Sequence, residues 1–420
     1  MMQRIERRLS GCSTMLSYDG RLLLIKSVFA SLPIFFMSSL ALPVGVLQQI
    51  NKYLRNFLWR KFGMEDRGTA LIAWSKVCRP KKQGGLGILD ISIHNKALLM
   101  KNLLKFLNKE DIPWINLIWE KYYHTELPRR KVEGSFWWKS HIALLERFKQ
   151  ISKCSIGSGQ SILCCSDTWL EQQLQSLLPH LHSFALHEDQ SVLSFFLEEN
   201  WIDQFHLPLS VVAFEEFNQL PSLAPTLDPQ VKDRWNIIGA SGRPSSILIY
   251  NLLLDNHEEH PFFSLIWDSS SRLKHKIFFW LVAHCRINTR ALLLRKGMHL
   301  DDTFCPNCNQ QAEETPMHLL WDCSFAQDCW NSLIPNRRRG TSVYEDTILA
   351  TQLLPKQFAV EILILGCWNI WIQRNNFVFR ALPHSIQSWR YHLKNDLKLL
   401  RHKIKQKFAV RFSQRIDHNL

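Results

Sequence analysis

Four candidate metal ligands between residues 305 and 323 constrain the fold more than any other feature of the sequence. Cys305 and Cys308 are separated by a Pro-Asn pair, nine residues then precede His318, and four more precede Cys323. Two cysteines at this spacing can place both sulfurs on one ion from a tight turn, and zinc prefers thiolate and imidazole ligands in tetrahedral structural sites. We therefore predict one Zn²⁺ site that stabilises a segment too small to form its own core.

Other interpretations of the cysteine pair remain open on spacing alone. The sequence has 11 cysteines, so one such pair can arise by chance among buried free thiols. A redox dithiol would open a helix after a strand, whereas this pair follows the polar residues Asp301 to Thr303. Cys329 is the rival fourth ligand, although Phe325 and Trp330 beside it predict a helix that faces the core. Four protein ligands would leave no open position for catalysis.

Charge and cysteine content limit the classes of function. Lys and Arg number 51 against 37 Asp and Glu, which gives a net charge of +14. Such an excess favours a polyanionic partner, RNA or DNA above all, and we expect no small-molecule substrate. An odd number of cysteines without the spacing of a disulfide scaffold predicts a reducing compartment, nuclear or cytoplasmic.

An uncharged stretch over residues 27–47 is long enough to span a membrane. Pro33 and Pro43 divide it into pieces of the length of core helices. We therefore predict no membrane association.

Apolar periodicity predicts a mainly α protein with four segments along the chain. These are a helical module over residues 1–125, a middle region with a short β-hairpin over 126–230, a small helical zinc-binding domain over 231–335, and a C-terminal helix pair over 336–420. Within them we expect helices near 44–60, 91–107, 247–255, 277–284 and 289–295. Phe279 and Trp280 fall at helical spacing among aliphatic residues and are predicted to lie in the core.

The middle region gives the weakest pattern. Residues 156–162 read as the hairpin, with its turn at Ser158-Gly159, and the three prolines within 220–229 predict a linker.

Basic side chains gather near the C-terminus, where the last predicted helix covers residues 384–408. Its apolar stripe contains Trp389, Leu393 and Leu397. A basic amphipathic helix can bind nucleic acid, a membrane surface or a partner helix, or can present a solvated face. The candidate nucleic-acid contacts are Arg337, Arg338, Arg339, Lys394, Lys398, Arg401, Lys403, Lys405 and Lys407.

Segments on both sides of the cysteine motif carry a family resemblance. They are Lys274–Val282, Arg286–Thr289, Leu292–Gly297, Glu314, Ala326 and Trp330. In order and spacing they resemble the zinc-binding domain that follows the polymerase in plant non-LTR (LINE-type) retrotransposon reverse transcriptases, over about residues 250–333. Residues 243–246 depart from the strand-like sequence of that family.

Earlier segments resemble the thumb and connection that follow the polymerase palm in the same proteins. They are Leu9–Gly11, Leu16–Leu22, Ile25–Val28, Leu32–Pro33, Phe57–Trp59, Trp74–Cys78 and Gly84–Ile88. The resemblance implies a nucleic-acid-binding accessory region that begins downstream of the palm and ends where complete relatives often carry a ribonuclease H domain. The alternative is a structural or protein-interaction remnant in which zinc only stabilises the fold.

Catalysis by a polymerase requires aspartates that hold magnesium, two of them adjacent in a Tyr-x-Asp-Asp hairpin. The sequence contains no such pattern, and Tyr344-Glu345-Asp346 lacks the second aspartate. We therefore predict that this chain is not an enzyme.

Overall fold

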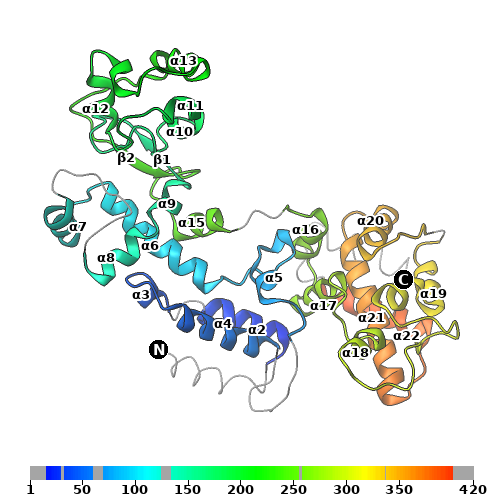
Figure 1. Ribbon diagram of the computed structural model, residues 1–420. Coiled ribbons are helices and arrows are strands. Elements are labelled where there is room, and N and C mark those ends of the chain that lie inside the picture. Colours follow the sequence, from blue (N-terminus) through cyan, green and yellow to red (C-terminus); the bar gives the residue numbers. More distant parts are fainter. Residues whose placement is uncertain are drawn as a thin grey trace. The chain divides into compact units, whose positions relative to one another are not determined.

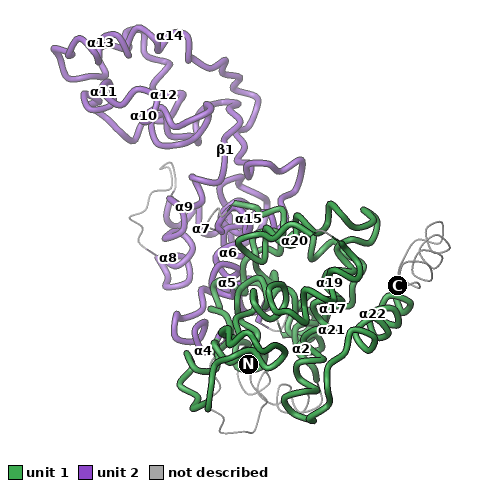
Figure 2. Tube along the Cα trace, turned by 90° about the vertical axis from the view of Figure 1, so that its right-hand side faces the viewer, with its two compact units in different colours: residues 1–30, 52–89, 257–420 green, residues 31–51, 90–256 purple. Residues whose placement is uncertain are grey.

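The computed structural model describes residues 16–29, 33–59, 70–123, 134–254, 258–335 and 337–400. Helices make up nearly all of its regular structure, which confirms the predicted mainly α class (Figure 1). The chain forms two compact units (Figure 2): unit 1 contains residues 1–30, 52–89 and 257–420, and unit 2 contains residues 31–51 and 90–256. This division does not test the four predicted segment boundaries, which stay predictions.

Unit 2 is built on helix α6 (Ile91–Leu107), which has the bounds predicted from apolar periodicity. The Asp90 carboxylate caps its first turn by accepting the backbone N–H groups of Ser92 and Ile93 at 2.8 and 3.2 Å. Helix α15 (Ser246–Leu253) packs on α6, and the Tyr250 hydroxyl accepts the N–H of Asp90 at 2.9 Å. The predicted helix over 247–255 is therefore confirmed with slightly earlier bounds.

Shorter helices complete unit 2. They are α3 (Ile34–Met37), α7 (Pro113–Ile118), η3 (Trp119–Tyr123), α8 (Phe136–Ile142), α9 (Leu145–Lys149), α10 (Leu174–Leu177), α11 (Pro179–His182), α12 (Val192–Leu197), η4 (Trp201–Gln204), α13 (Val211–Phe217) and α14 (Leu220–Leu223). The stretch predicted as a linker begins with α14, whose Leu220 is buried.

The hairpin predicted at residues 156–162 is wrong. Residues 156–161 form a loop, and strand β1 (Ser152–Ser155) instead pairs antiparallel with β2 (Arg234–Ile237), with Ser152 opposite Ile237. The Ser-Gly signal marks a change of chain direction, but it carries no information about a strand partner some eighty residues away. The two short strands form the only sheet in the part of the chain that the structure describes.

A buried carboxylate explains why this loop does not become a hairpin. One oxygen of Asp233 accepts the N–H groups of Gly157 and Gly159, both at 2.8 Å. The other oxygen accepts the N–H and the hydroxyl of Ser161 at 2.9 and 2.8 Å. A side chain at residue 157 would meet the Val231 carbonyl oxygen at 2.3 Å, so glycine is required there. The loop therefore folds around Asp233, directly before β2.

A second buried carboxylate lies close by in unit 2. Asp167 pairs with Lys149 at 2.6 Å and accepts the N–H of Leu163 at 2.8 Å. Burial raises the pKa of Asp167, and the ammonium of Lys149 opposes that rise. The Asp-x-Trp pattern at 167–169 thus anchors the fold, because the Trp169 indole also donates to the Cys164 carbonyl at 2.8 Å.

Unit 1 holds the remaining elements. They are α2 (Tyr18–Leu24), η1 (Ile25–Phe29), α5 (Trp74–Cys78), η2 (Lys81–Gln83), α16 (Pro261–Asp268), α17 (Leu273–Ala283), α18 (Arg290–Arg295), η5 (His318–Asp322), α19 (Ser324–Asn331), α20 (Val343–Leu353), α21 (Ala359–Arg380) and α22 (Ile386–Leu400). Helix α4 (Val44–Trp59) crosses from unit 2 into unit 1 along the chain. Helices α17 and α18 confirm the predictions over 277–284 and 289–295, and Phe279 and Trp280 are fully buried as predicted.

Helices α21 and α22 are the predicted C-terminal pair. The stripe of Trp389, Leu393 and Leu397 is fully buried, and the Trp389 indole donates to the Gly366 carbonyl at 3.1 Å. A side chain at residue 366 would meet the Trp330 ring at 2.4 Å, so glycine there lets α19 approach α21 closely. The predicted continuation of the last helix beyond residue 400 lies outside the described residues. No helix among the described residues is long and apolar enough to cross a bilayer.

Replacing Asp233 tests its role in unit 2. Asp233→Asn removes the charge and one acceptor oxygen, so buried N–H groups of the 157–161 loop lose their partners. We expect a loss of about 1–3 kcal/mol in the free energy of unfolding, measured by urea titration. Asp228→Asn, an exposed change of the same kind a few residues earlier, is the control. Equal stability of the two variants would contradict this role.

Candidate metal centre

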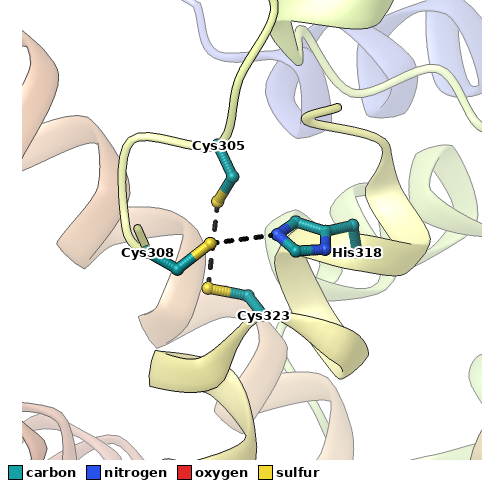
Figure 3. A group of neighbouring side chains, drawn as sticks. All are labelled: Cys305, Cys308, His318 and Cys323. Carbon is teal, nitrogen blue, oxygen red and sulfur yellow. Dashed lines mark hydrogen bonds between the residues drawn. The ribbon is translucent and has the colours of Figure 1, made fainter. Parts of the chain in front are cut away.

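The structure brings the four predicted ligands together in unit 1 (Figure 3). One ligand atom from each of Cys305, Cys308, His318 and Cys323 lies within 4.8 Å of every other. The Sγ atoms of Cys305 and Cys323 are 3.8 Å apart, and the Sγ of Cys308 is 3.3 Å from the Nε2 of His318. A zinc tetrahedron has edges of about 3.8 Å between sulfurs and about 3.5 Å between sulfur and nitrogen, given its bond lengths. The donor set fits one zinc ion in both size and chemistry.

The first two cysteines lie on a turn closed by backbone hydrogen bonds. Phe304 and Glu313 form an isolated antiparallel bridge. Next to it, the N–H of Cys305 donates to the Ala312 carbonyl at 2.9 Å, and the N–H of Glu314 donates to the Thr303 carbonyl at 2.8 Å. This closure places Cys305 and Cys308 on the same side of a short loop.

His318 is the first residue of the short helix η5, and Cys323 directly follows its last residue. The Thr315 hydroxyl accepts the N–H of His318 at 3.1 Å, and this bond starts the turn that presents the imidazole. The N–H of Cys323 donates to the His318 carbonyl at 2.6 Å. Cys323 then directly precedes α19, so it lies at the break between the two helices, one helix length from His318.

Backbone N–H groups point at all three sulfurs. Burial raises the pKa of the Cys308 thiol. Hydrogen bonds to Cys305 from Asn307, to Cys308 from Gln310, and to Cys323 from Ala326 and Phe325 act in the opposite, lowering direction on the pKa of the thiol they reach. The hydrogen bond with the Cys305 thiol is the largest cause that lowers the pKa of Cys323, to about 4, whereas it raises the pKa of Cys305 together with burial. The N–H donors favour the thiolate form, which is the form that binds metal.

Cys329 lies outside this group. It is fully buried in α19, and burial raises the pKa of its thiol. Within the described residues, the four-residue cluster is the only group of three or more His, Cys, Asp or Glu side chains placed to hold a metal ion.

A buried ion pair ties the metal loop to the rest of unit 1. Glu314 is fully buried, and its two oxygens accept hydrogen bonds from Nε and Nη2 of Arg374 at 2.6 and 2.8 Å. The second oxygen also accepts the N–H of Arg290 at 2.7 Å, in the first turn of α18. Glu314 therefore joins the loop, α18 and α21 at one point. Arg374 is not among the residues predicted for the site. The sequence signal that could have indicated it is a single arginine on the apolar, buried face of α21.

Arg337, a predicted nucleic-acid contact, is held inside the fold. Its side chain is 4% exposed and pairs with the fully buried Asp346. It also donates to the Trp321 carbonyl at 3.2 Å and lies over the Trp321 ring, 5.1 Å from the centroid. Arg337 thus stabilises unit 1 and does not present its charge at the surface.

Of the other predicted basic contacts, four lie among the described residues. Arg338 and Arg339 are exposed, and Arg339 donates to the Gln327 side chain at 2.8 Å. On α22, Lys394 is half-buried and Lys398 is exposed. Arg401, Lys403, Lys405 and Lys407 lie outside the described residues.

Comparison with known proteins places this site in a family. Residues 245–330 match the family described as zinc-binding in reverse transcriptase. A protein of Arabidopsis thaliana named "putative ribonuclease H protein" is 26% identical over 356 residues, which are 81% of this chain and 56% of the relative. An uncharacterized mitochondrial protein of Arabidopsis thaliana is 26% identical over 144 residues, which are 33% of this chain and 93% of that relative. This chain thus spans little more than half the length of the first relative.

The matched segment is helical and contains a candidate metal site of three cysteines and one histidine. All four candidate ligands fall inside the matched segment, so residues 245–330 resemble a reverse transcriptase zinc-binding domain in both sequence and donor set. The match confirms the resemblance to a reverse transcriptase zinc-binding domain that the sequence shows over about residues 250–333.

Removing Arg374 tests the contact between the metal loop and α21. Arg374→Met leaves the Glu314 carboxylate buried without its cation, so we expect the free energy of unfolding to fall by about 3–5 kcal/mol. The further change Glu314→Gln should restore part of the loss, because it removes the unpaired charge. Chemical denaturation of the three proteins measures both effects. Arg380→Met, an exposed change on the same helix, is the control, and an equal loss there would contradict the assignment.

Proposed function

We propose that Cys305, Cys308, His318 and Cys323 bind one Zn²⁺ ion whose role is structural. The observation that carries this proposal is the arrangement of three sulfurs and one imidazole nitrogen at tetrahedral spacing within 4.8 Å. Catalytic zinc keeps a position open for water, whereas four protein ligands close the coordination sphere. Because the loop has no core of its own, the free energy of metal binding contributes directly to its folding.

The function that this domain supports best is that of an accessory region of a LINE-type reverse transcriptase which binds nucleic acid. The family match and the net charge of +14 favour a polyanionic partner. Packing within unit 1 favours this function over a partner-helix remnant, because the apolar stripe of α22 is already buried against α21. On the described part of α22, the exposed residues include Lys398, whose side chain is charged.

The proposal includes no polymerase activity for this chain. It rests on the sequence, which lacks the Tyr-x-Asp-Asp pattern that holds the catalytic magnesium ions. Extension of a primer on a template by the purified chain with magnesium is the result that would contradict this part.

Two serine substitutions decide the ligand set. Cys308→Ser removes a proposed ligand, so we expect the bound zinc to be lost and the 303–323 loop to unfold locally. Cys329→Ser changes a buried cysteine of the same region outside the cluster, and we expect it to retain one zinc per chain. Elemental analysis of the purified proteins gives the answer. Equal zinc content in the two variants, or none in the wild type, would refute the assignment.

Salt dependence tests the proposed partner. Single-stranded RNA or DNA should bind at low salt and dissociate as salt approaches about 200 mM, because phosphate contacts release counterions. Changing Arg401, Lys403, Lys405 and Lys407 together to Gln should reduce the slope of log affinity against log salt by up to about 3. Fluorescence anisotropy measures both. Lys356→Gln, an exposed change elsewhere in unit 1, is the control that shows the effect of removing one charge outside this segment. Affinity that does not respond to salt would favour the structural remnant.

A further inference from the structure

A pocket of about 430 Å³ lies within unit 1, apart from the metal cluster. Its walls come from α2, α17, the turn after α17, and α21, which are labelled in Figure 1. Helix α2 packs on α17, and α17 packs on α21, so the described residues hold these walls together. The volume falls within the range of about 300–1,000 Å³ that is typical of small-molecule sites. The pocket is therefore large enough for one nucleotide.

Aromatic rings form much of the wall. Trp368 and Trp371 lie three residues apart on α21 and so share one face of that helix. Phe278 from α17 contacts both rings, with centroids 5.1 Å from Trp368 and 6.2 Å from Trp371. Tyr18 on α2 is 41% exposed at the same pocket. Phe278 is buried, whereas Tyr18, Trp368 and Trp371 are partly exposed, and partly exposed rings are the surfaces on which unpaired bases stack.

Two cations stand at this pocket without an acidic partner. Lys274 and Arg286 are both exposed, and neither forms an ion pair within the described residues. The ammonium of Lys274 lies over the Trp368 ring, 5.5 Å from its centroid. Aromatic faces beside unpaired cations match the two parts of a nucleotide, its base and its phosphate.

The positive charge continues beyond the pocket. Burial lowers the pKa of His284, and the neighbouring charges of Lys76, Arg286 and Arg79 lower it further. Lys76 lies in α5, Arg79 directly follows that helix, and Arg286 lies in the turn after α17. None of the three is in an ion pair within the described part of the chain. A strand with one base in the pocket would find further phosphate contacts here.

The pocket also contains one carboxylate. Asp19 accepts the hydroxyl of Ser17, and both residues line the wall. A carboxylate repels phosphate but accepts hydrogen bonds from the amino groups of bases. The acid therefore fits the base end of a bound nucleotide, whereas Lys274 and Arg286 fit its phosphate end.

We propose that this pocket binds one nucleotide unit, supplied by an unpaired nucleotide of a single strand, with its base stacked on the aromatic wall and its phosphates at Lys274 and Arg286. The inference deepens the proposed nucleic-acid function and rests on it. It assigns the recognition of single strands to unit 1, through residues that are distinct from the candidate contacts near the C-terminus.

Charge-matched variants of the full chain test the pocket. The double variant Lys274→Ala/Arg286→Ala should bind a fluorescein-labelled 12-nucleotide single strand about tenfold more weakly than the wild type. Arg295→Ala/Lys356→Ala removes two exposed charges of unit 1 that do not line the pocket, and its affinity should change by no more than about twofold. A strand carrying 5-iodouracil should crosslink on irradiation to Tyr18, Trp368 or Trp371, as read by mass spectrometry.

The outcomes separate this inference from the proposed function. If the strand binds with steep salt dependence, but both double variants bind equally and the crosslinks lie elsewhere, the pocket is refuted while the proposed function stands. Equilibrium dialysis with adenosine monophosphate tests whether the pocket binds a free nucleotide when the chain binds no strand. Saturable binding that Lys274→Ala/Arg286→Ala abolishes, without any strand binding, would support the pocket as a site for free nucleotide and refute the proposed function. Absence of both kinds of binding would refute both.

Discussion

Three sulfur atoms and one imidazole nitrogen within 4.8 Å of one another are the constraint on which unit 1 depends most. Three thiolates at this spacing repel each other strongly unless a cation lies among them, and protonated thiols would leave the turn with only weak contacts. The backbone N–H groups directed at each sulfur favour the charged form. The proposed zinc ion would account for the closed loop, for the break between η5 and α19, and for the burial of Cys305 and Cys323.

Buried charge pairs connect this loop to the surrounding helices. Glu314 joins the loop to α18 and α21, and Arg337 joins the segment after α19 to Asp346 on α20. Such pairs contribute little net stability compared with apolar side chains of the same shape, because both charges must lose their water. Their geometry is specific, however, and each holds two elements at a fixed position. Gly366 adds a steric constraint by leaving room for the Trp330 ring.

Much of this could be predicted from the sequence where the signals are local. Apolar periodicity predicts α6 over 91–107, and the Cys-x-x-Cys spacing with His318 and Cys323 predicts the metal cluster. Contacts between residues far apart in the sequence could not be predicted, because no local pattern indicates them. The Ser158-Gly159 turn was assigned to a hairpin because nothing nearby shows that Asp233 would take its N–H groups. Arg337 was assigned to a basic surface because a run of arginines does not reveal the buried Asp346.

The metal's coordination sphere is the most direct test of the central claim, that a closed structural zinc site organises unit 1. X-ray absorption at the zinc edge of the purified chain reports the number and kind of ligands. The account predicts three sulfurs at about 2.3 Å and one nitrogen at about 2.0 Å, with no oxygen ligand. Four sulfurs would mean that Cys329 replaces His318, and a water oxygen in place of a protein ligand would mean an open site. Either spectrum would contradict the account.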